Sequence, residues 1–233
     1  MSLASAIQNS IANRGRPVPA SISFVVDSSG SMDPYVDTVK QSVCLFLEEQ
    51  QKVRGVASLM LAHFNDDFTK VIDHAPIKNI KCSTFNNEYR TTGGTALIDA
   101  IFKSIHDMEN NLISKKPDPQ EKIVMAFMTD GEENMSKKSA KDLSALIREK
   151  INAGWNFMLL GADKKTLEVA DEYGIARDCT AVYSIENPKA AIQLLSDKLK
   201  EVRRGKELLI TSGERQALLC SGTWEQCKLK TEL

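Results

Sequence analysis

Residues 22–31 read ISFVVDSSGS, an apolar run rich in β-branched residues that ends abruptly in a polar turn. Such a run predicts a β-strand over 22–26 that is buried on both faces and is followed by a loop. Beyond the loop, apolar residues recur at helical spacing from about Tyr35 to Gln51, which predicts an amphipathic helix. A strand, a polar loop and a helix in this order are typical of an α/β protein.

The rest of the chain repeats this alternation. Further apolar runs predict strands at 56–64, 68–72, 123–128, 155–160 and 181–185. Apolar stripes predict helices near 97–112, 143–151, 167–173 and 188–205. Only three residues separate the second strand from the third, so these two strands must be antiparallel. We therefore expect an α/β fold with a doubly wound, mostly parallel central sheet, one antiparallel edge strand and helices on both faces.

Composition and charge place the chain among ordinary globular proteins. Of its 233 residues, 42% are apolar and 26% are charged, which excludes collagen-like, disordered and disulfide-scaffold proteins. Thirty basic against 31 acidic side chains leave a formal net charge of −1, so the global charge favours neither nucleic acid nor an anionic membrane as a partner. No window approaches the roughly 18 consecutive apolar residues of a membrane span, and no signal-peptide pattern opens the chain. We expect a cytoplasmic protein with no nucleic-acid or membrane partner.

Breaker residues and apolar content predict the domain boundaries. Residues 1–20 contain Gly15, Pro17 and Pro19 and are interpreted as an arm that ends in a linker. Residues 21–204 form the α/β domain. Residues 205–233 are too apolar for a disordered tail, so we expect this extension to pack on the domain.

The five cysteines form an odd and scattered set, which is typical of reduced thiols in a chain large enough to fold without disulfides. Cys220 and Cys227 flank Trp224 and are a candidate redox pair. Their spacing is not the CxxC of thiol oxidoreductases, so free thiols are the favoured interpretation.

Oxygen-bearing side chains follow the predicted strands at positions that share one edge of the sheet. Asp27, Ser29 and Ser31 lie on the turn after the first strand, and Gly30 allows that turn to fold back. Thr95 ends the turn TTGGT ahead of the predicted helix at 97, and Asp130 follows the strand 123–128. Ligands of open α/β sheets bind at the carboxyl ends of the parallel strands, where such loops converge.

These five side chains form a candidate metal site that contains no nitrogen or sulfur donor. All-oxygen donor sets suit hard cations, and two carboxylates with small hydroxyls fit Mg²⁺ best, with Mn²⁺ or Ca²⁺ as alternatives. If the hydroxyls contact the ion and the carboxylates hold its waters, the metal stays electron-poor and accepts a further anionic ligand. The alternative for Asp27, Ser29 and Ser31 alone is a capped turn, because Asp and Ser are also strong N-cap residues.

The three motifs, in this order, resemble the metal-ion-dependent adhesion site (MIDAS) of von Willebrand factor type A domains, and the resemblance covers roughly residues 21–204. It implies a Rossmann-like fold in which Ser29, Ser31 and Thr95 coordinate the metal while Asp27 and Asp130 bind it largely through water. In the family, a Glu or Asp from a partner protein completes the coordination. The second metal site of some integrin subunits would need acidic residues where Pro34 and Tyr35 stand, so it is not expected.

The resemblance is to short cytoplasmic members of bacterial or phage-like type. Such proteins are often adaptors, and the implied partners include AAA-type ATPases and stress-response complexes. The leading hypothesis is therefore a non-catalytic protein-binding module that depends on a divalent metal.

Two other hypotheses stay open. One is a Mg²⁺-dependent hydrolase of phosphatase type, although Ser29 occupies the position where such enzymes need a second Asp. The other is a structural protein that self-assembles by placing its own acidic residue in the next copy's metal site. The phosphate-loop, dinucleotide-binding and nucleophile-elbow motifs are absent from the sequence.

Several polar residues near the site have simpler interpretations. Asp66 and Asp67 lie in the predicted hairpin turn, where Asp is favoured by its own backbone hydrogen bonds. The residues directly after Asp130 are expected either on the rim of the site or in the first turn of the following helix; they are Glu132, Glu133 and Asn134. Tyr89 is expected either to contact a partner or to anchor the Thr95 loop.

Overall fold

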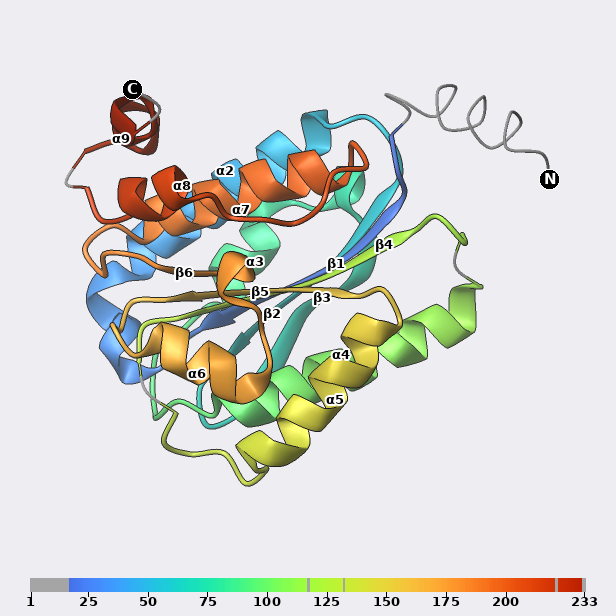
Figure 1. The fold of residues 1–233 in the computed structure, drawn as a ribbon, viewed down its shortest axis with the longest axis horizontal. Coiled ribbons are helices and arrows are strands. Elements are labelled where there is room, and N and C mark those ends of the chain that lie inside the picture. The colour runs from blue at the N-terminus through green and yellow to red at the C-terminus, as the bar shows by residue number, and fades with distance from the viewer. Residues whose placement is uncertain (1–16, 117, 132, 221, 232–233) are drawn as a thin grey trace.

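The computed structural model describes residues 17–116, 118–131, 133–220 and 222–231, and its centre is a six-stranded sheet (Figure 1). The strands are β1 (Ala20–Asp27), β2 (Ala57–Phe64), β3 (Phe68–Pro76), β4 (Lys122–Thr129), β5 (Asn156–Gly161) and β6 (Thr180–Val182). Their order in the sheet is β3-β2-β1-β4-β5-β6, and all pairs are parallel except β2 with β3. The predicted fold class is therefore confirmed.

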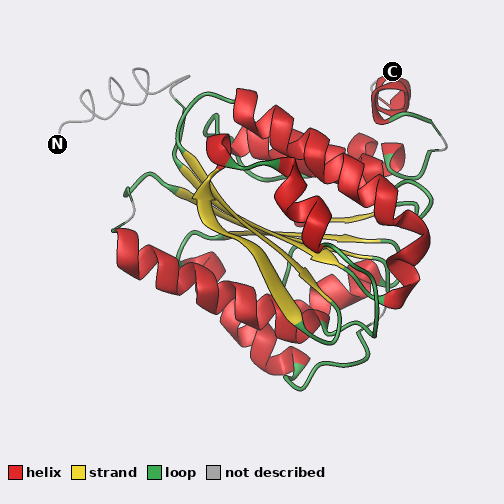
Figure 2. Cartoon of the chain, turned by 180° about the vertical axis from the view of Figure 1, so that it is seen from behind, coloured by secondary structure: helices red, strands yellow, loops and turns green. Residues whose placement is uncertain are grey.

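Helices cover both faces of this sheet, as Figures 1 and 2 show from opposite sides. They are α2 (Val36–Lys52), α3 (Cys82–Glu88), α4 (Leu97–Lys115), α5 (Ala140–Asn152), α6 (Thr166–Tyr173), α7 (Pro188–Val202), α8 (Ser212–Ala217) and α9 (Trp224–Thr231). Short 3₁₀ turns lie at Gly30–Tyr35, Ile77–Asn79 and Arg177–Cys179.

Strand β1 is buried along its whole length and separates two hydrophobic cores. Because successive side chains of a strand point to opposite faces, Phe24 packs in the core beneath α2, α3 and α7, while Val25 packs in the core beneath α4, α5 and α6. This double burial explains why the strand is a nearly continuous apolar run.

The register of the parallel strands places the candidate site residues side by side. Val26 of β1 pairs with Met128 of β4, so Asp27 and Thr129 leave the sheet next to each other. The chain turns to opposite sides of the sheet after these two strands, which makes the gap between β1 and β4 a topological switch point.

The C-terminal segment covers the edge of the sheet at β6. Leu208 and Ile210 are buried, and the Ile210 N–H donates to the Asp178 carbonyl at 2.7 Å. Arg215 of α8 donates from Nε to the Thr180 carbonyl at 3.1 Å. The short strand β6 therefore does not present a free edge on this side, which protects it from pairing with other chains.

Some local details differ from the expectations. Helix α3 was not expected, because Phe85 is its one buried residue and a single apolar position makes no stripe. Strand β6 is shorter than the predicted 181–185, since it ends at Val182 opposite Gly161, the last residue of β5, and the chain turns at residues 185–186. No helix among the described residues is long and apolar enough to cross a membrane.

The expectation that all five cysteines are reduced is wrong for one pair. Cys44 of α2 and Cys82 of α3 form a disulfide, with their Cα atoms 5.1 Å apart. The two residues are 38 positions apart in sequence, and only the packing of α3 against α2 brings them together.

Candidate metal centre

The turn after β1 carries three of the candidate site residues. The Ser29 N–H donates to Asp27 Oδ1 at 2.7 Å, which folds the chain back over the end of the strand. The hydroxyls of Ser29 and Ser31 then lie 3.1 Å apart. Asp27 and Ser29 are buried, whereas Ser31 is exposed.

Asp130 and Thr95 reach the same place from two other loops. Ser29 Oγ donates to Asp130 Oδ1 at 3.4 Å, across 101 positions of sequence. Thr95 Oγ1 lies 3.5 Å from where a Cβ on Gly131 would stand, which places the threonine hydroxyl beside the residue that follows Asp130. Hydrogen bonds thus join Ser29 to Asp27, Ser31 and Asp130, and the Thr95 hydroxyl lies beside Gly131, the residue after Asp130.

Backbone hydrogen bonds hold two of the three loops against each other. The Gly30 N–H donates to the Gly93 carbonyl at 3.0 Å, and the Thr92 N–H donates to the Ser28 carbonyl at 2.9 Å. These bonds fix the Thr95 loop to the turn after β1.

Asn134 and Asp66 support the Thr95 loop, a role that the sequence did not predict for either residue. Asn134 accepts from the Thr95 N–H through Oδ1 at 2.9 Å, and its own N–H donates to the Thr95 carbonyl at 3.1 Å. Asp66 accepts from the Gly94 N–H through Oδ1 at 2.9 Å, so this hairpin residue stabilises the loop. The turn-forming residue types Asn and Asp were the only sequence signal for these roles.

Two buried tyrosines support the ends of the strands. Tyr89 Oη donates to the Asp27 carbonyl at 2.6 Å, and Tyr183 Oη donates to the Thr129 carbonyl at 3.1 Å. The Tyr89 ring stacks on Phe85 of α3 with ring centroids 5.0 Å apart. Of the two roles considered for Tyr89, the buried ring performs the anchoring one.

The whole domain, and not only its site, matches a known family. Residues 21–198 match the family model of the von Willebrand factor type A domain. The chain belongs to this family. A comparison with curated protein sequences gives no match.

Solved type A domains share the fold with this chain at low sequence identity. A von Willebrand factor type A protein from Catenulispora acidiphila aligns with a TM-score of 0.58 and 15% identity, over 82% of this chain and 44% of that one. Proximal thread matrix protein 1 from the mussel byssus, in a structure with a zinc-occupied MIDAS motif, aligns with a TM-score of 0.58 and 18% identity, over 80% and 47% of the two chains. Manganese-loaded TRAP protein from Plasmodium vivax aligns with a TM-score of 0.53 and 14% identity, over 77% and 72%.

This type A domain chain spans less than half the length of the first two of these proteins, at 44% and 47%. At such identities the likeness concerns the fold alone. The ligand of this domain therefore depends on the residues of its own site.

The electrostatics of the site in this type A domain favour a cation. Burial raises the pKa of the Asp27 carboxyl to about 6, because desolvation disfavours its charged form. Hydrogen bonds from Ser29 and Thr129 oppose this rise, and the nearby charge of Asp130 adds to it. Among the described residues, no basic side chain forms an ion pair with Asp27 or Asp130. Two neighbouring carboxyl groups that are surrounded by hydroxyl oxygens, and that form no ion pair with a described basic side chain, fit a hard divalent ion.

Glu133 stabilises α4, and not the helix that follows it in the chain. Its Oε2 accepts from the Ile98 N–H at 2.8 Å, and its Oε1 accepts from the Ser136 N–H at 2.7 Å. The carboxylate therefore satisfies the first turn of α4, not that of the following helix α5. Glu132, considered with it for the rim, lies outside the described residues.

Proposed function

We propose that this type A domain is a non-catalytic protein-binding module that depends on a divalent metal. One observation supports the proposal: at the switch point hydrogen bonds join Ser29 to Asp27, Ser31 and Asp130, and the Thr95 hydroxyl lies beside Gly131. The two carboxylates have no basic partner among the described residues. Ser29, Ser31 and Thr95 would coordinate the ion directly, while Asp27 and Asp130 would hold it largely through water. The ion we propose is Mg²⁺, with Mn²⁺ or Ca²⁺ as alternatives.

The partner would supply the remaining ligand as a Glu or Asp side chain. Asp27, Ser29 and Thr95 are buried, but Ser31 is exposed and Asp130 is half-buried, so the donor cluster is accessible from outside. A metal held by neutral hydroxyls keeps most of its charge, which favours an anionic ligand at the open position. The bound ion would attract the partner's carboxylate electrostatically, and the three loops would fix the direction from which that carboxylate approaches the ion.

A non-catalytic role fits the residues next to the donors. A phosphatase-type hydrolase needs an acid or base two residues after its first Asp, and Ser29 has no acidic or basic group to act in this way. Assays for phosphatase and nuclease activity with Mg²⁺ or Mn²⁺ test this point, because turnover that is lost in Asp27→Asn would contradict the proposal.

The class of partner follows from the family resemblance. We propose an AAA-type ATPase or a stress-response complex in the cytoplasm. The Cys44–Cys82 disulfide is more typical of an oxidising compartment. Counting the free thiols of protein isolated from its native cells distinguishes the two locations, since a cytoplasmic protein should carry five.

The decisive experiment is affinity capture from the native cell extract with Mg²⁺ or with a chelator. We expect capture of a partner in Mg²⁺ only, and loss of capture in Asp130→Asn. Asp67→Asn is the matched control, because Asp67 is an exposed carboxylate of the nearby β2–β3 turn and lies outside the donor set. Capture that neither the chelator nor Asp130→Asn affects would refute the proposal, and a Mg²⁺-dependent mass shift of the pure protein would favour self-assembly instead.

A further inference from the structure

Strand β3 contains a β-bulge where it passes α4. Two of its residues, Asp73 and His74, stand opposite the single residue Met60 of β2. His74 has a φ of 43° at this bulge, in the left-handed region. In a regular strand the side chains of two successive residues point to opposite faces. Here they gather with Asp107 of α4, and one nitrogen or carboxylate oxygen of each residue lies within 4.8 Å of the others.

The imidazole of His74 is the buried member of this Asp–His–Asp cluster. Its side chain is 6% exposed, and its Nε2 lies 3.0 Å from Asp107 Oδ2. Ligand atoms about 2.1 Å from a tetrahedral Zn²⁺ lie about 3.4 Å apart, so these two atoms need only a small shift to share one ion. His74 Nδ1 has no hydrogen-bond partner among the described residues. No second hydrogen bond therefore fixes which ring nitrogen carries the proton, and Nε2 is free to bind a metal ion.

The ammonium of Lys70 already lies between the two carboxylates of the cluster. Its Nζ is 2.9 Å from Asp73 Oδ1 and 2.8 Å from Asp107 Oδ1. The fold thus builds a place for a cation here. The side chain of Lys70 is 30% exposed and that of Asp73 is 70% exposed, so this side of the cluster is open to solvent. Exposed ion pairs contribute little to stability, and a divalent ion can therefore displace the ammonium into water at small cost.

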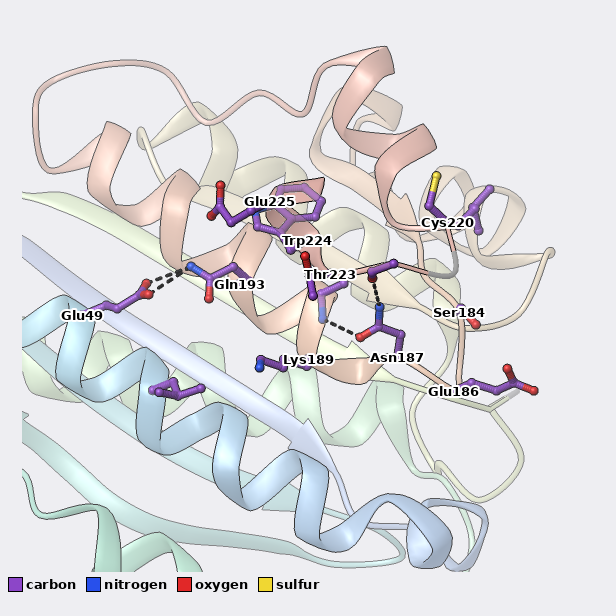
Figure 3. A pocket seen from close by; sticks show the side chains of 14 residues that line it. Glu49, Ser184, Glu186, Asn187, Lys189, Gln193, Cys220, Thr223, Trp224 and Glu225 are labelled. Atoms are coloured by element: carbon purple, nitrogen blue, oxygen red, sulfur yellow. Dashed lines mark hydrogen bonds between the residues drawn. The ribbon is translucent and has the colours of Figure 1, made fainter. Parts of the chain in front are cut away.

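Acidic side chains at the largest hollow of the surface do not gather in this way. Glu49, Glu186 and Glu225 line the pocket between α2, α7 and the C-terminal helices, which has a volume of about 810 Å³. Figure 3 shows them at separate places around the pocket, and Glu49 is paired with Lys200 at 2.8 Å. Among the residues that the structure describes, the Asp–His–Asp cluster is the one group of three carboxylate, thiol or imidazole side chains close enough to share an ion.

We propose that Asp73, His74 and Asp107 form a Zn²⁺ site, separate from the candidate metal centre at the carboxyl ends of the strands. One imidazole nitrogen and two carboxylate oxygens are ligands that Zn²⁺ takes in proteins, and water would be the fourth ligand. Mg²⁺ prefers oxygen ligands alone and keeps several of its waters, so it does not compete well for this donor set. The bound Zn²⁺ would replace the Lys70 ammonium and join the bulge of β3 to α4.

The test is calorimetric titration of the full chain with Zn²⁺ near neutral pH. All proteins carry Asp130→Asn, so that the candidate metal centre does not contribute. Cysteine thiols also bind Zn²⁺, and the site is therefore defined as the binding that Asp107→Asn removes. We expect one equivalent of Zn²⁺ that is lost in Asp107→Asn and in His74→Asn, since asparagine tolerates the positive φ but lacks the imidazole. Asp73→Asn changes an exposed side chain, keeps the packing of His74 and should weaken the same binding.

Removal of the competing ammonium separates a metal site from a purely structural ion pair. Lys70→Met should bind Zn²⁺ about tenfold more tightly, because the ion no longer displaces two ion pairs. Lys103→Met is the matched control, since Lys103 is exposed, lies one helical turn before Asp107 and is outside the cluster; a change below about twofold is expected there. Zn²⁺ binding that is the same in Asp107→Asn and Asp73→Asn as in their parent, or that Lys70→Met does not strengthen, would overturn the proposal.

Discussion

The hydroxyls of Tyr89 and Tyr183 fix the backbone from which the two carboxylates of the candidate metal centre extend. Both rings are buried, and each hydroxyl donates to the carbonyl at the end of one strand, at Asp27 or at Thr129. Burial raises the pKa of both phenols, so they stay protonated and act as donors at every physiological pH. If the tyrosine hydroxyl is removed, no water can reach the buried carbonyl to replace it as a hydrogen-bond donor.

Tyr89→Phe is expected to lower the free energy of unfolding by about 1–2 kcal/mol, because the Asp27 carbonyl loses its buried donor. It should also weaken divalent-metal binding by about tenfold, since residues that orient metal ligands have effects of this size. Urea unfolding measures the first effect and calorimetric titration the second. Tyr183→Phe is the matched comparison, with a smaller loss expected from its longer 3.1 Å bond. An unchanged metal affinity in Tyr89→Phe would contradict this role.

His74 lies in a strained and half-buried position of β3. Its φ of 43° is in the left-handed region, and its Nε2 lies 3.0 Å from Asp107 Oδ2 of α4. Lys70 donates to Asp107 at 2.8 Å and bridges to Asp73 at 2.9 Å, so its ammonium already balances both carboxylates. Burial lowers the pKa of His74, and the attraction of Asp107 does not fully offset it.

This lowered pKa predicts a pH dependence of stability. The unfolded chain binds the His74 proton near pH 6.5, above the pKa in the folded state. The stabilisation by neutral His74 is therefore fully present above about pH 6.5 and is lost as the pH falls through the folded pKa. His74→Asn, which tolerates positive φ, should flatten the decline of the free energy of unfolding between about pH 7 and 5. Equally steep profiles for the two proteins would show that other groups cause the decline.

Helices α2 and α7 are joined by a buried arginine. Arg203, just after α7, is fully buried and donates from Nη1 to the Gln50 carbonyl at 2.9 Å and from Nη2 to the Val53 carbonyl at 3.2 Å. Gln50 lies in the last turn of α2 and Val53 just after it, where carbonyls have few helical N–H donors; the Gln50 carbonyl also accepts from the Val53 N–H at 3.2 Å. The negative end of the helix dipole also stabilises the guanidinium charge.

Arg203→Met is expected to reduce the free energy of unfolding by about 3 kcal/mol, because several buried carbonyls lose their donors at once. Arg204→Met is the matched control, since that side chain is exposed, and a change within about 0.5 kcal/mol is expected there. Chemical unfolding of both variants measures the difference. Similar small losses of unfolding free energy in the two variants would mean that water can donate hydrogen bonds to the carbonyls at the end of α2.

Metal binding should stabilise the molecule as a whole, because the site exists only when three loops from distant parts of the chain are folded. At a Mg²⁺ concentration about a hundredfold above the dissociation constant, the gain is about 2.7 kcal/mol. For a chain of this size that corresponds to a rise in melting temperature of about 5–10 °C. Thermal unfolding with Mg²⁺ and with a chelator checks this, and Asp130→Asn should melt at the same temperature in both. Identical melting of the wild type in the two solutions would contradict the candidate site.

Much of the fold and of the candidate site could be predicted from local patterns. The double-sided burial of β1 follows from its apolar run, and the antiparallel placement of β3 follows from the three-residue gap before it. The convergence of Asp27, Ser29, Ser31, Thr95 and Asp130 was predictable because the carboxyl ends of parallel strands share one edge. That these residues bind Mg²⁺ stays a prediction.

Sequence alone determined the periodicity of each element, the direction of neighbouring strands and the residue types at the strand ends, since all of these depend on residues close together in the chain. Tertiary structure alone decided the Cys44–Cys82 disulfide, the Tyr89 and Tyr183 anchors and the Arg203 contacts. Each of these depends on which surfaces pack together, and a hydrogen bond such as that between Arg203 and Gln50, across 153 positions, has no local pattern to predict it. Burial then sets the contribution of such a hydrogen bond to stability, because a buried polar group that loses its partner cannot bond to water in its place.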